Sequence, residues 1–75
     1  MNTAATTVAN KRQQMINLLD KQTTAGIIRI MEELNKRTDD AADLVYMAAF
    51  HVLGSRIGWE KAEEYSDNIM MGGAQ

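Results

Sequence analysis

The amino-acid sequence predicts an all-α protein, a small bundle of three to four helices that is completed by self-association. The chain has no proline and no alternating run of β-branched or aromatic residues of the kind that predicts strands. Several of its segments carry apolar residues at helical spacing. The segment 41–59 is apolar on nearly every side of a helix, so it needs neighbours all around it.

The first half of the chain predicts two helices. Residues 1–7 are small and polar, and we expect them to be flexible. A helix over residues 8–19 follows. Thr23 or Thr24 then caps a second helix by accepting a hydrogen bond from the free amides of its first turn. The apolar face of this second helix comprises Ile27, Ile28, Met31 and Leu34.

The third helix is expected to begin after Thr38, whose hydroxyl is a good cap. Asp39 and Asp40 follow it and suit the positive end of a helix dipole. This helix should reach Leu53, or continue through Gly54 until a second glycine stops it.

The last helix is expected from Trp59 to about Met70, and the glycines after it end it. We therefore predict one helical domain over residues 8–71 and a flexible tail over residues 72–75.

Two apolar stripes run along the third helix, so this helix needs two neighbours. The chain's own helices supply one, and we expect a second copy of the chain to supply the other. Its alanines would let a neighbouring helix approach closely. The alternative is a central helix that its own shorter partners cover completely. The residues expected between copies are Ala41, Leu44, Val45, Ala48, Ala49 and Val52.

Composition excludes several classes of protein. A chain of 75 residues makes one domain of marginal stability. The absence of cysteine excludes disulfides and thiolate zinc sites, and a single histidine excludes a histidine-rich metal site within one chain. No nucleophile, acid–base pair, P-loop or glycine-rich dinucleotide turn is set up by spacing. We predict no catalytic residue, no metal and no cofactor.

The apolar segment 41–59 carries charged residues and is too short to cross a bilayer, which takes about 20 mostly uncharged residues. The start of the chain lacks the apolar core of a signal peptide. The expected setting is therefore the cytoplasm, without membrane contact.

The last helix carries the candidates for binding another protein. Its acidic residues recur at helical spacing and form either a docking strip for a basic surface or a solvated face. Tryptophan and methionine neighbours suit an interface anchor, although we expect the four aromatic residues to form the centre of the core. The candidates are Trp59, Glu60, Glu63, Glu64, Asp67, Met70 and Met71.

These observations predict a non-enzymatic interaction protein that self-associates and binds or modulates another protein. Its size and style are typical of a phage or mobile-element accessory protein that inhibits a host enzyme. A less favoured alternative is a nucleic-acid-associated regulator, because the net charge is −2 and the last helix is acidic. The basic residues for that alternative are Lys11, Arg12, Lys21, Arg29, Lys36 and Arg37.

A third alternative is a protein that sequesters a small ligand in a pocket between two copies. Arginine and aromatic side chains are the residue types such a pocket would use. Those available for it are Arg29, Arg56, Tyr46 and Trp59.

Overall fold

The computed structural model describes residues 3–73, with side chains placed for residues 10–72. It contains four helices in sequence order: α1 (Thr3–Leu19), α2 (Thr24–Leu34), α3 (Asp40–Ile57) and α4 (Trp59–Gly73). Over the described range there is no strand, so the predicted all-α class and the small helical bundle are confirmed.

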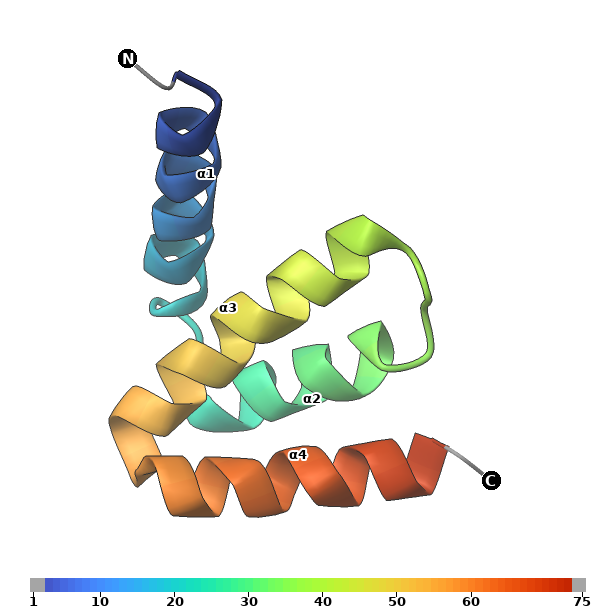
Figure 1. The fold of residues 1–75 in the computed structure, drawn as a ribbon. Coiled ribbons are helices and arrows are strands. Elements are labelled where there is room, and N and C mark those ends of the chain that lie inside the picture. The colour runs from blue at the N-terminus through green and yellow to red at the C-terminus, as the bar shows by residue number, and fades with distance from the viewer. Residues whose placement is uncertain (1–2, 74–75) are drawn as a thin grey trace.

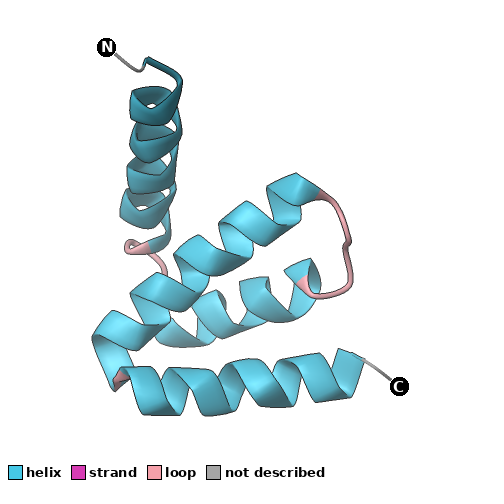
Figure 2. Cartoon of the chain, in the orientation of Figure 1, coloured by secondary structure: helices cyan, strands magenta, loops and turns pink. Residues whose placement is uncertain are grey.

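Helix α3 is the centre of the fold, and each of the other helices packs against it (Figure 1). α2 and α4 also contact each other. α1 stands away from the layer that α2, α3 and α4 form, while short connections join successive helices (Figure 2). The molecule is accordingly elongated, with extents of 44 × 26 × 19 Å.

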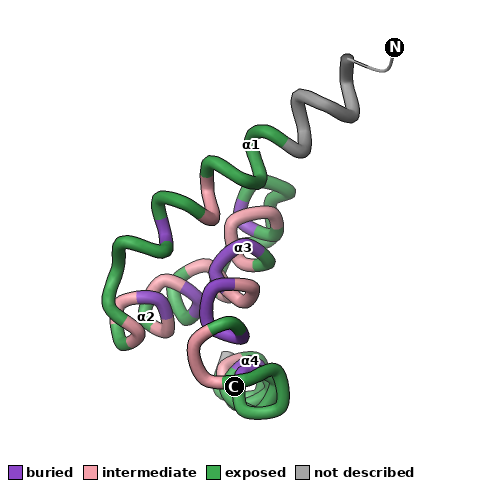
Figure 3. Tube along the Cα trace, turned by 90° about the vertical axis from the view of Figure 1, so that its left-hand side faces the viewer, coloured by how far each residue is buried: buried purple, intermediate pink, exposed green. Residues whose placement is uncertain are grey.

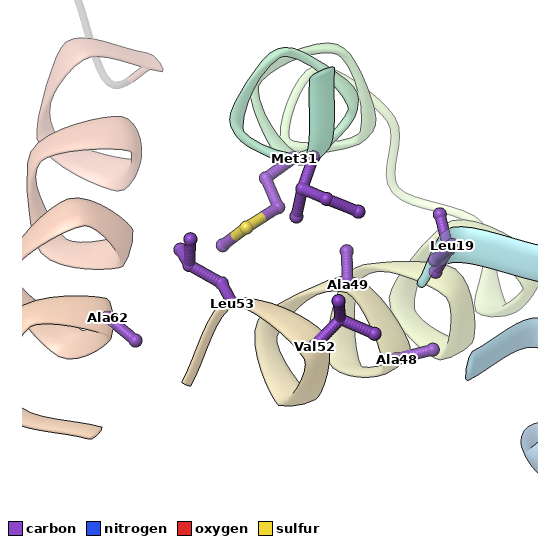
Figure 4. Close-up of a cluster of buried hydrophobic side chains, with 8 residues drawn as sticks. Leu19, Met31, Ala48, Ala49, Val52, Leu53 and Ala62 are labelled. Atoms are coloured by element: carbon purple, nitrogen blue, oxygen red, sulfur yellow. The ribbon is translucent and has the colours of Figure 1, made fainter. Parts of the chain in front are cut away.

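The core lies where α1, α2 and α4 pack against α3 (Figure 4). Ile27 and Met31 of α2 and Leu53 of α3 are completely buried there. Each such side chain contributes about 1.5–3 kcal/mol by leaving water. Ala62 of α4 and Leu19 of α1 complete the cluster from the other helices. Figure 3 shows the buried positions concentrated along α3, with isolated ones on its neighbours.

The caps of α2 and α3 decide where these helices begin. The hydroxyl of Thr23 accepts a hydrogen bond from the amide of Gly26 at 3.0 Å, so the predicted cap of α2 is confirmed. At α3 the cap is Asp39 and not Thr38. The Asp39 carboxylate accepts from the amide of Ala42 at 3.3 Å. A carboxylate in this position offsets the dipole of the helix, which a hydroxyl cannot do.

Arg37 holds the capping carboxylate in place from the preceding loop. Its Nε and Nη2 donate to the two carboxylate oxygens of Asp39 at 3.0 and 2.8 Å. This bidentate pair lowers the pKa of Asp39 below its ordinary value of 3.8, because the side-chain hydrogen bonds from Arg37 favour the charged form.

Two boundaries differ from the sequence-based expectation, those of α1 and α4, and the end of α3 follows the second of the two expected alternatives. α1 begins at Thr3, so residues 3–7, expected to be flexible, are helical, and no glycine or proline interrupts them. α3 passes through Gly54, and Gly58 ends it. α4 includes Gly72 and Gly73 of the expected tail. Residues 1–2 and 74–75 of the two predicted flexible ends lie outside the described residues.

Gly58 ends α3 because its backbone adopts φ +95° and ψ 149°. This region of backbone space is essentially restricted to glycine. Its amide still donates to the carbonyl of Gly54 at 2.9 Å, and its carbonyl accepts from Ala62 at 3.0 Å. α3 and α4 therefore follow each other with a one-residue link, which fixes where the first residue of α4 lies.

Candidate interaction surface

Trp59, the first residue of α4, lies with its ring directly on the backbone of α3. A Cβ atom placed on Gly54 would be 2.2 Å from two carbons of that ring. No side chain larger than hydrogen fits between them. The ring centroid of Trp59 is also 6.1 Å from that of Phe50 and 5.7 Å from that of His51, both on α3. Such tilted aromatic pairs are favourable.

Although its ring is held on one side, Trp59 is 51% exposed. It therefore presents a large apolar surface to solvent in a fixed orientation. Two methionines near it are similarly open, Met47 of α3 at 61% and Met70 of α4 at 52%. Exposed large apolar side chains are ordinary when scattered singly, but a cluster of them is characteristic of an interaction site.

These side chains line one open hollow of about 400 Å³, which we call the Trp59 hollow. α3 and α4 contribute most of its lining, and α1 contributes one basic side chain. Its residues are Arg12, Tyr46, Met47, Phe50, His51, Trp59, Ser66 and Met70.

Two hydroxyl groups that line the Trp59 hollow bond to each other. The hydroxyls of Tyr46 and Ser66 lie 2.7 Å apart and form one hydrogen bond between α3 and α4. Ser66 is buried, so this bond satisfies a hydroxyl that would otherwise have no partner. The hollow is thus mostly apolar, with one hydrogen bond between α3 and α4 inside it.

Acidic side chains flank the hollow on α4. Glu63 follows Trp59 by four residues, and Asp67 precedes Met70 by three, so all four lie toward one side of the helix. Both carboxylates are exposed. The ion pairs of the described residues are Lys36–Glu33, Arg37–Asp39 and Arg56–Asp20, and none of them includes an acid of α4.

A second hollow, of about 450 Å³, lies between α2 and α4 on the other side of α4. The amide of Asn35, which lines it, donates to the carbonyl of Ile69 at 3.2 Å and ties the two helices together. Only one of its lining residues, Tyr65, is a large exposed apolar side chain. The lining residues are Ile28, Glu32, Asn35, Lys36, Tyr65, Asn68, Ile69 and Gly72.

The stripe expected between copies is largely occupied by the chain's own helices. Ala48, Ala49 and Val52 are buried in the core of the single chain. Leu44 and Val45 are half-buried, and Ala41 is exposed. A second copy could reach only the N-terminal end of this stripe, so self-association of this fold has to involve other residues as well.

The partner-binding candidates on α4 divide into three groups. Trp59 and Met70 are brought together in the Trp59 hollow. Met71, although 70% exposed, does not line the Trp59 hollow. The acids are exposed along the helix, as the sequence predicts: Glu60, Glu63, Glu64 and Asp67.

The basic candidates for nucleic-acid binding are all exposed but are spread over separate elements. Lys11 and Arg12 lie on α1 and Arg29 on α2, and the others lie in loops. Those in the α2–α3 loop already face acids: Lys36 pairs with Glu33 and Arg37 with Asp39. The remaining candidate is Lys21, between α1 and α2.

The residues proposed for a small-ligand pocket are not gathered in the single chain. Arg56 donates to the carbonyl of Asp20 at 2.6 Å and to the hydroxyl of Thr24 at 3.3 Å, so it fastens α3 to the start of α2. Tyr46 and Trp59 share the Trp59 hollow. Arg29 is exposed on α2 and does not line that hollow.

Sequence reasoning placed the aromatic residues wrongly and missed part of this surface. Trp59 and Tyr65 are exposed, so the aromatic residues are not the centre of the core. Met47 and His51 were not among the site candidates, although their spacing of four residues on α3 places them on one side. The glycine five residues before Trp59 was the other available signal.

Over the described residues, no group of three histidine, cysteine, aspartate or glutamate side chains could hold a metal ion. Within the same range no helix has both the length and the apolar character needed to span a membrane. No family model matches the chain, and no curated protein or solved structure is significantly similar to it.

Proposed function

We propose that this chain is a non-enzymatic interaction protein that binds another protein through the Trp59 hollow. The observation that carries the proposal is the position of the Trp59 ring. The ring is half-exposed and lies against the backbone of Gly54, where any residue other than glycine would clash with it. Tryptophan is strongly enriched among the residues that dominate binding energy at interfaces. A ring already fixed in place loses little conformational freedom on binding.

The surroundings of the ring support a protein partner. Met47 and Met70 add flexible, polarizable side chains, which adapt to the surface of a partner. The hollow is open and mostly apolar, with charged residues at its edges, and this is the usual arrangement of an interface. A role as a cytoplasmic accessory protein of a phage or mobile element that inhibits a host enzyme is consistent with the small size and the absence of cysteine.

Two neighbouring methionines provide a matched test. Met70 lines the Trp59 hollow and Met71 does not, and both are exposed on α4. Met70→Glu and Met71→Glu make the same chemical change in the same turn of the same helix. We would capture partners from the lysate of the natural source with the unmodified chain and with each variant, and quantify each captured protein by mass spectrometry.

The expected result is a stoichiometric partner that Met71→Glu retains and Met70→Glu loses. Equal circular dichroism spectra of the two variants would show that the loss is not due to unfolding. A partner that both variants retain would contradict the assignment of the hollow. Recovery of nucleic acid in place of a protein, with binding that falls steeply as salt rises, would replace the proposal by the regulator alternative.

A further inference from the structure

The described side chains of helix α1 are mostly exposed. Among residues 10–19, Met15, Ile16 and Leu19 pack on the core. From Asn10 to Gln14 every side chain is exposed, and Leu18 is an exposed apolar residue at 63%. The radius of gyration is 12.9 Å, whereas a compact chain of this length has about 11 Å. α1 therefore presents an uncovered surface.

The charges of α1 and α4 are opposite, and although Arg12 of α1 lines the Trp59 hollow of its own chain, it forms no ion pair with an acid of α4 there. α1 contains two basic residues, Lys11 and Arg12, and no acid. α4 contains four acids and one lysine. Neither helix takes part in an ion pair with the other among the described residues. Electrostatic complementarity of this kind brings surfaces of different molecules together in a defined orientation.

We infer that α1 of a second copy of this chain docks on the Trp59 hollow, and that the exchange is reciprocal. Leu18 of one copy would cover the exposed surface of Trp59 and Met70 in the other. The basic residues of the same α1 would face Glu63 and Asp67 at the edge of the hollow. A two-fold axis makes both contacts at once, as expected for a closed dimer.

The inference rests on the proposed function, because it assigns an occupant to the same hollow. It also adds a form of regulation. A target protein that binds at Trp59 has to displace the second copy, so the dimer would hold the chain in a covered state until the target is present.

Reciprocal charge reversal tests the pairing of helices. The first variant, Lys11→Glu/Arg12→Glu, makes α1 acidic, and the second, Glu63→Lys/Asp67→Lys, makes the edge of the hollow basic. Each variant alone places like charges at both contacts of a homodimer. A mixture of the two places opposite charges at both contacts of a heterodimer. All of the altered side chains are exposed, so the fold is expected to persist.

A third variant controls for net charge. Lys21→Glu/Arg29→Glu gives the chain the same net charge as the first variant but alters exposed residues outside α1 and outside the hollow. We would measure the mass of every sample by analytical ultracentrifugation from low micromolar to millimolar concentration at low salt.

The expected result is a dimer for the unmodified chain and for the control, monomers for each charge-reversed variant, and a dimer for their mixture. A monomeric unmodified chain at every concentration would overturn the inference. Dimers of both charge-reversed variants, as strong as that of the unmodified chain, would overturn it too, because another surface would then hold the copies together.

The outcomes separate this inference from the proposed function. A monomer that still captures a partner sensitive to Met70→Glu would refute the inference alone. A dimer that follows the charge pattern, without any captured partner protein, would refute the proposed function alone.

Discussion

The two sides of α3 differ in what covers them. On one side, Ala49 and Leu53 pack against Ile27 and Met31 of α2, and all four are fully buried. On the side that carries Met47 and His51, α1 and α4 leave an open hollow, and Met47 remains largely exposed. The difference shows that the three other helices bury most of the apolar surface of α3 but leave the side with Met47 uncovered.

The largest expected effect distinguishes the closed side from the open one. Leu53→Ala removes a fully buried side chain and should destabilise the fold by about 2–5 kcal/mol. Met47→Ala removes an exposed one and should change the stability by no more than about 0.5 kcal/mol. Urea denaturation of both variants measures these changes. Similar losses in the two variants would mean that the open side is in fact part of the core.

The next effect concerns the contact between the Trp59 ring and Gly54. Gly54→Ala places a methyl group 2.2 Å from the indole carbons, so the ring has to leave its position. Such overpacking typically costs about 1–3 kcal/mol. Near-ultraviolet circular dichroism should lose its tryptophan signal, while the far-ultraviolet helical signal persists.

A second substitution shows whether the cost of Gly54→Ala comes from the ring. With Trp59→Ala also in place, the methyl group meets no ring, and alanine should be the more stable residue by up to about 1 kcal/mol in a helix interior. An unchanged penalty in the double variant would mean that another contact of Gly54 is responsible.

An effect of similar size is expected at the hydrogen bond between Tyr46 of α3 and Ser66 of α4. Tyr46→Phe removes the hydrogen bond to Ser66 and leaves a buried hydroxyl without this partner, at a cost of about 1–3 kcal/mol. Tyr46→Phe/Ser66→Ala removes both hydroxyls and should be closer in stability to the unmodified chain. Thermal unfolding monitored by circular dichroism compares the two. If the double variant is the less stable, the bond does not act as a pair.

The smallest effect concerns the exposed start of α3. Because the folded-state pKa of Asp39 lies below 3.8, this carboxylate contributes stability that is present above its unfolded pKa and is lost as pH falls through the folded pKa. Arg37→Gln should raise the pKa of Asp39 toward 3.8, since the side-chain hydrogen bonds from Arg37 are its main cause. An NMR titration of the Asp39 carboxyl carbon measures the shift. An unmoved pKa would assign it to the backbone contacts instead.

Local chemistry made most of the helix boundaries predictable. Thr23 caps α2, because a hydroxyl before a helix can accept from the free amides of its first turn. Gly58 ends α3, because glycine can adopt a backbone conformation that a helix does not continue. The cap of α3 shifted from Thr38 to Asp39 because Arg37, two residues before Asp39, pairs with its carboxylate. That pair depends on the shape of the loop, which the residue pattern does not specify.

The candidate site was less predictable, because it depends on which apolar side the chain covers by itself. The sequence predicts that one of the two apolar stripes of α3 faces a second copy. The structure buries residues of both stripes, Ala48 as well as Ala49, and leaves open the side that carries Met47. The exposure of Trp59 likewise follows from a one-residue link at Gly58, which places the ring at the end of α3. Composition alone favours a core position for such a residue.

The most direct test uses the fact that Trp59 is the only tryptophan of the chain, so its fluorescence reports on the hollow alone. Acrylamide quenching would be measured over the concentration range used for sedimentation, and again with a captured partner. The proposed account predicts efficient quenching in the dilute chain and progressive protection as a second copy or the partner covers the ring. Equal quenching at every concentration and in the presence of the partner would contradict it.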